Sequence, residues 1–321
     1  MKIVKKILIG LVALVVLAVL GVVTRFYVML PKARAAQNLT APNTPEAIER
    51  GRYLANHVAV CTGCHSKVDE SKPGEPVVDG HLGEGRVFPE IPGFPGIIRA
   101  PNITPDKETG LGNWTDGEIV RAIREGLSKD GRVLFPMMPY KSFAASLSDA
   151  DTLAIVAYLR SLPPIKNDPG RMQVNFPVSM FIRAVPAPVT QPAGDAPADV
   201  VARGNWLLTL GNCHDCHDAF NERREPIPGK ELSGGTMMEL PGRGKVYAAN
   251  ITSDQATGIG SYTDDDLLRV LNEGIGKSGR PLYGMPWWYY KGMTEQDKRA
   301  LIAALRQVKP VVNAVPPSDV K

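Results

Sequence analysis

Two short motifs of cysteine and histidine stand out in the 321-residue chain. They read Cys-Thr-Gly-Cys-His at residues 61–65 and Cys-His-Asp-Cys-His at residues 213–217. In each motif, two thiols three positions apart can bond the two vinyl groups of one haem, and the adjacent histidine then lies under the haem iron. The spacing predicts two covalently bound haem c groups. The attachment residues are Cys61, Cys64, Cys213 and Cys216, and the iron ligands are His65 and His217.

A zinc site and a redox-active dithiol are the other common uses of a Cys-x-x-Cys pair. However, the adjacent histidine can scarcely turn back to a zinc ion that its neighbouring cysteine holds. A redox dithiol gives that histidine no role in either copy. The haem interpretation uses all four cysteines of the chain, so no thiol remains for a disulfide, a catalytic nucleophile or a cysteine ligand to iron.

The second axial ligand decides what each haem can do, because a filled coordination site excludes substrate. In the second half of the chain the only other histidine is His214, which lies between the two cysteines and cannot reach the opposite haem face. Met285, in Met-Pro-Trp, matches Met138, in Met-Pro-Tyr, and each precedes the last helix of its half. Recurrence at matching places favours ligation over core packing, so we predict Met138 and Met285 as the second ligands.

Several neighbouring residues compete for these roles or support them. Met137 is a competitor for Met138, and His57 and His81 are competitors in the first half, although each histidine is more typical of a surface or a satisfied core position. Arg132 and Arg280 each follow a glycine before the methionine loop. Their guanidinium groups match carboxylates, which makes them candidates to hold haem propionates.

The two motifs belong to two copies of one longer unit. Asn-Ile-Thr at residues 102–104 recurs at residues 250–252, and Thr-Gly, Thr-Asp, Glu-Gly and Gly-Arg pairs follow in the same order in both copies. This repetition indicates a duplicated domain. The asparagines and threonines of this loop either contact propionates or shape turns.

Each copy is predicted to consist of helices joined by long loops rich in glycine and proline. Helices at residues 45–57 and 198–211 lead into the cysteine motifs. Sequences typical of capping boxes begin at Thr115 and Thr263, and the last helices begin at Ser148 and Thr294. Little alternating strand pattern is present, so we expect an all-α fold in which the loops wrap the haems.

The chain begins with a segment that is apolar enough to enter a membrane. Three lysines precede an unbroken run of apolar residues and glycine from Ile7 to Val23, which spans about 25 Å as a helix. A cleaved signal peptide is the rival interpretation, with a small-x-small site at residues 33–35. The long apolar core favours an uncleaved single-pass anchor. In a bacterial chain, covalent haem attachment belongs to the outer face of the inner membrane, so we expect the haem domains in the periplasm.

The net charge of +4 comes from the amino terminus. The first 36 residues carry six basic and no acidic side chains, so the other 31 basic and 33 acidic residues give the rest a charge of −2. No basic patch indicates nucleic-acid binding. The expected organisation is a membrane anchor at 1–36, a first domain at 37–165, a proline-rich linker at 166–197, a second domain at 198–310 and a tail at 311–321.

Together these motifs resemble the cytochrome c subunits of membrane-bound alcohol and gluconate dehydrogenases. The resemblance covers nearly all of residues 45–310, and it implies two tandem class I cytochrome c domains. Those subunits typically carry three haems, whereas this chain has two motifs and an amino-terminal anchor, as in the wider group of membrane-anchored dihaem cytochromes c. The resemblance implies that the chain is no enzyme but relays electrons between a dehydrogenase and a terminal oxidase or another cytochrome.

A dihaem peroxidase is the alternative, since such enzymes also carry two haem motifs in a chain of similar size. A peroxidase needs an iron that opens to peroxide and acid or base groups beside it. Matching methionines in both halves argue against that chemistry. A haem sensor or an assembly subunit is a third option that the sequence leaves open.

Overall fold

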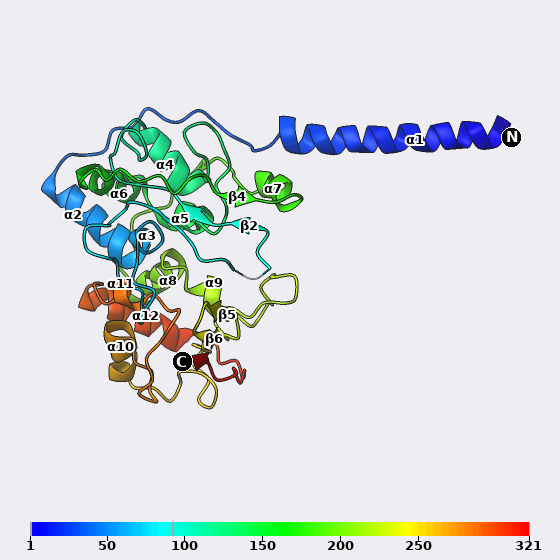
Figure 1. Ribbon diagram of the computed structural model, residues 1–321. Helices are drawn as coiled ribbons and strands as arrows, with labels where there is room; N and C mark the ends of the chain where they lie inside the picture. The colour runs from blue at the N-terminus through cyan, green and yellow to red at the C-terminus, as the bar shows by residue number, and fades with distance from the viewer. Residues whose placement is uncertain (1, 92, 321) are drawn as a thin grey trace.

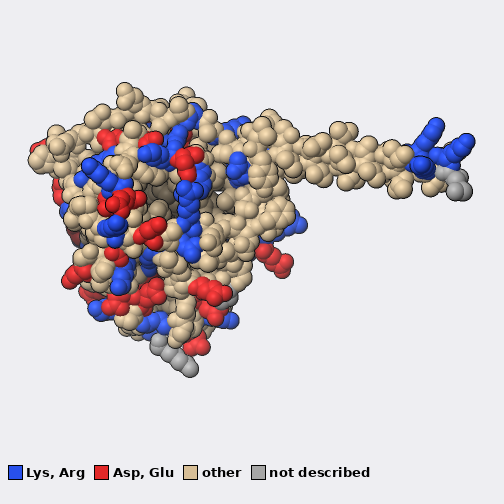
Figure 2. All heavy atoms as spheres, turned by 45° about the horizontal axis from the view of Figure 1, so that its top comes forward, with Lys and Arg blue, Asp and Glu red and all other residues tan. Residues whose placement is uncertain are grey.

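The computed structural model describes residues 2–91 and 93–320, and its first element is the apolar segment. Helix α1 (Lys2–Val23) continues into one π-helical turn, η1 (Thr24–Val28). It projects away from the rest of the chain, and none of its side chains is buried (Figure 1). By length and composition this helix can cross a membrane. Figure 2 shows a group of basic side chains at its outer end and a stretch with no charged side chains along it.

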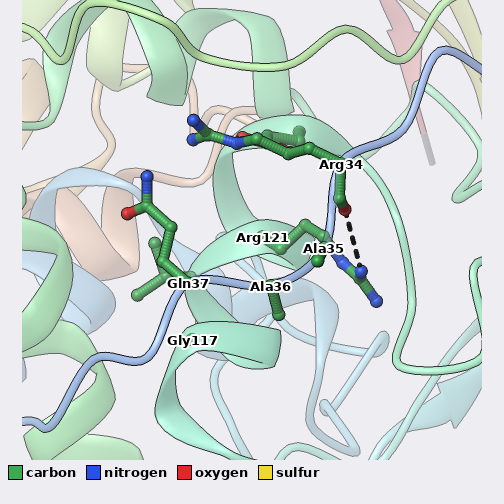
Figure 3. A pocket seen from close by; sticks show the side chains of 8 residues that line it. Arg34, Ala35, Ala36, Gln37, Gly117 and Arg121 are labelled. Atoms are coloured by element: carbon green, nitrogen blue, oxygen red, sulfur yellow. Dashed lines mark hydrogen bonds and ion pairs between the residues drawn. The ribbon is translucent and has the colours of Figure 1, made fainter.

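The segment after η1 lies against the first cysteine-containing half of the chain, which we call unit 1. Arg34 forms an ion pair with the buried carboxylate of Glu125 at 2.7 Å, and its carbonyl accepts a hydrogen bond from Arg121 at 3.2 Å (Figure 3). A side chain at Gly117 would collide with the carbonyl of Gln37 at 1.8 Å, so glycine allows the close approach. These contacts hold the chain that follows α1 and η1 against unit 1.

Each unit is built around helices in the same order. Unit 1 contains α2 (Pro45–Tyr53), the π turn η2 (Leu54–Val58), α3 (Cys61–Cys64), α4 (Asp116–Glu125), α5 (Tyr140–Ser146) and α6 (Asp149–Ser161). Unit 2 contains α8 (Val200–Leu210), α9 (Cys213–His217), α10 (Asp264–Glu273), α11 (Trp287–Tyr290) and α12 (Glu295–Gln307). Both predicted capping boxes are confirmed, at Thr115 and at Thr263, and the helices they open end at left-handed glycines.

The expectation of an all-α fold holds only in part, because segments of the loops pair as short antiparallel strands. Unit 1 pairs β1 (Arg86–Val87) with β3 (Arg99–Ala100) and β2 (Gly96–Ile97) with β4 (Gln173–Val174), all antiparallel. Unit 2 has an antiparallel sheet in the order β5 (Met237–Leu240), β6 (Gly244–Tyr247), β7 (Asp319–Val320). These strands have two to four residues each, too few for an alternating sequence pattern to identify them.

The segments that follow the last helix of each unit belong to the folded units. β7 lies in the predicted tail and pairs with β6. In the predicted linker, β4 pairs with unit 1, and α7 (Val178–Phe181) and η3 (Ile182–Ala184) follow it. Arg183 then donates hydrogen bonds to the carbonyl groups of Phe26 and Leu30, at 2.5 and 2.7 Å. The predicted linker therefore also contacts η1 and the chain that follows it.

The first and last helices of each unit cross where one of them has a glycine. A Cβ atom at Gly51 of α2 would lie 1.8 Å from the carbonyl oxygen of Ala154 in α6. At Gly204 of α8 it would lie 2.0 Å from the carbonyl oxygen of Ala300 in α12. Only glycine permits two helix backbones to approach so closely. This crossing packs the helix that precedes each cysteine motif against the last helix of the same unit.

The two units pack directly on each other, and residues of both form one continuous apolar core. Polar contacts add to this interface. Trp206 donates from Nε1 to the carbonyl of Ser146 at 2.7 Å, the Tyr289 hydroxyl donates to the carbonyl of Glu75 at 2.9 Å, and Tyr53 donates to Asp297. The units are thus fixed relative to each other.

His57 lies in this interface. Its Nδ1 is 3.0 Å from the carbonyl oxygen of Tyr289, so Nδ1 carries the proton and donates it. Burial lowers the pKa of His57, and the positive charge of Arg52 acts in the same direction. The ring stays neutral in the folded protein and its Nδ1 proton links the units.

We predict that replacing Gly51 by Ala destabilises unit 1 by about 3 kcal/mol, the upper end of the range for an overpacked core, because a carbonyl oxygen cannot move aside as a side chain can. Thermal unfolding of the haem-loaded protein measures this effect. Gly194→Ala is the matched control, since its Cβ meets nothing within 4 Å. Equal stability of both variants would contradict the close helix crossing.

We also predict that His57 makes the folded state less stable in mild acid. Because burial holds its pKa below the unfolded value of about 6.5, the unfolded chain takes up the proton first as pH falls. Stability is therefore fully present above this pH and decreases below it. We expect the free energy of unfolding, measured between about pH 5 and 8 where histidine titrates, to fall less with decreasing pH in His57→Gln than in the unchanged protein. His81→Gln serves as the control, and an unchanged slope for His57→Gln would refute the assignment.

Candidate haem sites

Both cysteine motifs begin in the same strained backbone conformation. Val60 and Asn212, which directly precede the first cysteine of each motif, have positive φ angles of 53° and 54°. Non-glycine residues rarely adopt this left-handed conformation, and they do so where the surrounding structure requires it. The short helices α3 and α9 follow directly. The two motifs are therefore local copies of each other, as the sequence predicted.

The two predicted iron-binding histidines have identical hydrogen bonds. His65 donates from Nδ1 to the carbonyl of Pro101 at 2.7 Å, and His217 donates to the carbonyl of Ala249 at 2.8 Å. A carbonyl only accepts, so Nδ1 carries the proton and Nε2 keeps its lone pair. Burial lowers the pKa of both histidines, which favours the neutral ring. A neutral imidazole oriented through its other nitrogen is the form that binds a metal.

The loops that carry these carbonyl groups are held by buried asparagines. Asn102 donates from its side-chain amide to the carbonyl of Ile165 at 2.6 Å and accepts from the backbone of Thr104 at 2.9 Å. Asn250 makes the equivalent bonds to Val311, at 2.8 Å, and Thr252, at 3.0 Å. Both asparagine side chains are thus occupied within the protein. Of the two roles open from the sequence, the geometry supports the shaping of turns.

One continuous cavity of about 910 Å³ opens beside the motifs. Both cysteines of the second motif, His217 and Met285 line it, and so does Cys64 of the first motif. Its volume lies at the upper end of the range of about 300–1,000 Å³ for ligand sites. The cavity therefore reaches from the second motif to the first.

The cysteines lack the low pKa of redox-active thiols. Burial raises the pKa of Cys61 and of Cys213 to about 12, whereas a reactive dithiol needs a thiol pKa below its ordinary value. Among residues 2–91 and 93–320, no three His, Cys, Asp or Glu side chains gather as they do around a bound metal ion. Neither alternative use of the Cys-x-x-Cys pairs finds support in this geometry.

The two methionines predicted as iron ligands differ in their surroundings from the competing Met137. Met138 and Met285 are half-buried, and both pack against the apolar core that also contacts Cys61 and Cys213. Met137 is 44% exposed. Met137 lines the cavity, whereas Met138 packs against the apolar core.

The two predicted propionate-binding arginines do not lie in equal environments. Arg132 is half-buried, burial lowers its pKa, and its Nε is a buried donor without a hydrogen-bond partner in the described chain. Arg280 lines the cavity but is exposed, and it donates to the carbonyl of Ser318 at 2.9 Å. The hydroxyl of Tyr140 is a second buried polar group of unit 1 without a partner among the described residues. Unpaired buried donors of this kind suit the carboxylates of a haem.

The competing histidines are engaged elsewhere. His57 lies in the interface between the units, as described above. His81 contacts Glu84 at 2.8 Å, and His214 contacts Asp218 at 2.9 Å. His57 is also oriented by a carbonyl, but its Nε2 lies 3.4 Å from Arg52, whereas His81 and His214 face carboxylates.

One side chain beside the cavity was not identified as a site residue from the sequence. Arg86 lines the cavity together with Cys64, and it has no counterpart in the repeat comparison. Both tyrosines of α11, Tyr289 and Tyr290, also line the cavity. Tyr290 is buried and donates to the carbonyl of Gly211 at 2.9 Å.

The cavity fits a haem c at the second motif, because both cysteines of that motif, His217 and Met285 line it, whereas only Cys64 of the first motif does. Residues 48–163 match the family described as Cytochrome c. The chain is 34% identical to the gluconate 2-dehydrogenase cytochrome c subunit of Pantoea cypripedii over 71% of this chain and 51% of the relative. It is 28% identical to the cytochrome c subunit of a quinone alcohol dehydrogenase of Gluconacetobacter polyoxogenes, over 86% and 59%.

A third relative is closer in length. The chain is 28% identical to a dihaem c-type cytochrome of Cereibacter sphaeroides over 77% of this chain and 81% of the relative. In contrast, the chain spans about half the length of the gluconate dehydrogenase subunit. The chain contains a cytochrome c domain and is homologous to the cytochrome c subunits of alcohol and gluconate dehydrogenases and to a dihaem cytochrome c.

Proposed function

We propose that the chain is a membrane-anchored dihaem electron carrier in the periplasm. It passes single electrons between a dehydrogenase and a terminal oxidase or another cytochrome. The observation that carries this proposal is the duplicated histidine geometry, in which His65 and His217 each present a free Nε2 beside a pair of cysteines. The names of the relatives, which are cytochrome c subunits of dehydrogenases, support a dehydrogenase as one partner.

In this proposal the four cysteines hold two haem c groups covalently, and the axial ligands are His65 with Met138 and His217 with Met285. Haem c supplies one-electron oxidation and reduction at its iron. The thioether sulfur of methionine stabilises the reduced form, and a filled sixth position excludes substrate. Both effects suit a carrier.

The residues between the two sites keep them close and dry. Tyr290 is buried beneath the cavity, and Tyr289 contacts unit 1 through the carbonyl of Glu75. Because α11 carries both tyrosines, the wall of the second site is also the contact with the first unit. Both tyrosines are buried, so water has little access to this wall. The two sites therefore act as one relay.

The optical spectrum of the purified protein tests this function. Two haems with methionine ligands show the weak methionine-to-ferric-iron band near the red end and do not change on addition of carbon monoxide or peroxide. A high-spin haem that takes up peroxide would refute the carrier and favour a peroxidase.

We predict that replacing Cys213 and Cys216 together by Ala halves the covalently bound haem, because the first pair is unaffected. Haem staining after denaturing electrophoresis, normalised to protein, measures the ratio. The matched control removes Cys61 and Cys64 instead and also leaves one haem per chain. Retention of two covalent haems in either variant would contradict the assignment of attachment residues.

We also predict that Met138→Ala halves the red-end methionine band and opens one haem to carbon monoxide. Met137→Ala is the matched control, and it leaves the band intact because this side chain is largely exposed. If the control loses the band and Met138→Ala keeps it, the two methionines exchange roles.

A further inference from the structure

An uncharged segment of the predicted linker lies directly beside the end of the membrane helix. It runs from β4 through α7 and contains no charged side chain. Phe181 of α7 packs edge-on against Phe26 of η1, with ring centroids 5.6 Å apart. Arg183, just after α7, donates to the carbonyl groups of Phe26 and Leu30. The position of α7 is therefore fixed relative to η1 (Figure 1).

The length of the apolar run places η1 at the edge of a bilayer. Counted from Ile7, a hydrocarbon core of about 30 Å takes roughly 20 residues at 1.5 Å each, so it ends within η1. Arg25 of η1 is exposed, and an arginine at this depth reaches the lipid headgroups. Because α7 is fixed to η1, it lies at the same boundary between acyl chains and headgroups.

The surface around this contact is apolar and exposed. Val28 after the membrane helix is 77% exposed, and Phe176 and Phe181 beside it in the fold are 73% and 54% exposed. β2 continues this surface, because it pairs with β4, which ends two residues before Phe176. Exposed apolar side chains that gather in one place mark sites of contact with proteins or membranes. We call this set the anchor-side surface, and its members are Tyr27, Val28, Met29, Ile97, Phe176 and Phe181.

We propose that the anchor-side surface is immersed in the outer part of the lipid bilayer, so that α7 contacts the membrane in addition to α1. Continuity with α1 favours lipid over a protein partner, because a surface fixed to the end of a membrane-spanning helix is already at the bilayer. Aromatic side chains with a nearby arginine suit this boundary, where an apolar face enters the lipid by roughly 5–10 Å. The guanidinium of Arg183 indeed lies 5.4 Å from the ring centroid of Tyr27.

This second contact changes how unit 1 sits at the membrane. A single helix joined to a soluble unit leaves that unit free to rotate about the helix. With α7 also in the lipid, unit 1 is held in one orientation against the bilayer. This inference rests on the membrane anchor of the proposed function.

Photochemical labelling of the full haem-loaded chain in lipid vesicles tests the inference. The vesicles contain phosphatidylethanolamine, phosphatidylglycerol and a phospholipid whose acyl chain carries a diazirine. After illumination and digestion, mass spectrometry should find lipid attached to α1 and also to the segment from Phe176 to Phe181. The segment around Val312 is the control, because this apolar side chain is 80% exposed but lies near the carboxyl end, and it should carry no lipid.

Cysteine substitutions give a second measurement in the same vesicles. Phe176→Cys and Phe181→Cys should react with a membrane-impermeant maleimide roughly tenfold more slowly than Val312→Cys, because lipid covers them. Phe176 and Val312 are similarly exposed in the fold, so burial within the protein does not produce this difference. An unchanged optical spectrum shows that each variant keeps its haem sites.

The inference is overturned if lipid is attached to α1 alone, or if both substituted cysteines react as fast as Val312→Cys. Slow labelling without attached lipid also overturns it, because a second copy of the chain then covers the surface. Failure of the proposed membrane anchor is a different result, in which no lipid is attached to α1 either.

Discussion

One hydrogen bond in each unit determines what the cysteine motif can do. A backbone carbonyl takes the Nδ1 proton of His65 or His217, and this leaves Nε2 as the basic atom of the ring. A single bond of this kind contributes roughly 0.5–1.5 kcal/mol, too little to orient a side chain against a competing arrangement. The loop that carries the carbonyl is therefore held in turn, by Asn102 in unit 1 and by Asn250 in unit 2, to the chain after the last helix.

Much of this arrangement is local in sequence and could be predicted. The cysteine motifs span five residues and the capping boxes four, so each is specified by its own side chains. The carbonyl that orients His65 lies 36 residues further along the chain, at Pro101. The pairing of β7 with β6 and the interface between the units depend on similar long-range contacts. Patterns within a short window contain no information about such pairs.

The arginines show a second limit of sequence comparison. Arg132 and Arg280 match in the repeat, which predicts equal roles, yet one is half-buried with an unused donor and the other is exposed and bonded to Ser318. Matching positions in the two units have similar backbone conformations but different neighbouring side chains. Arg86 is the opposite case. It has no match in the repeat, and its position beside Cys64 is evident only from the fold.

The interface between the units explains why the duplicated sites can work together. If a flexible linker alone joined the two units, the two motifs would come close to each other only by chance. Here Leu207 and Trp206 of unit 2 are buried in an apolar core shared with Val58 and Leu147 of unit 1. Opening the interface would expose these side chains, at a cost of roughly 1.5–3 kcal/mol for each large one. The distance between the two motifs is therefore a fixed property of the fold.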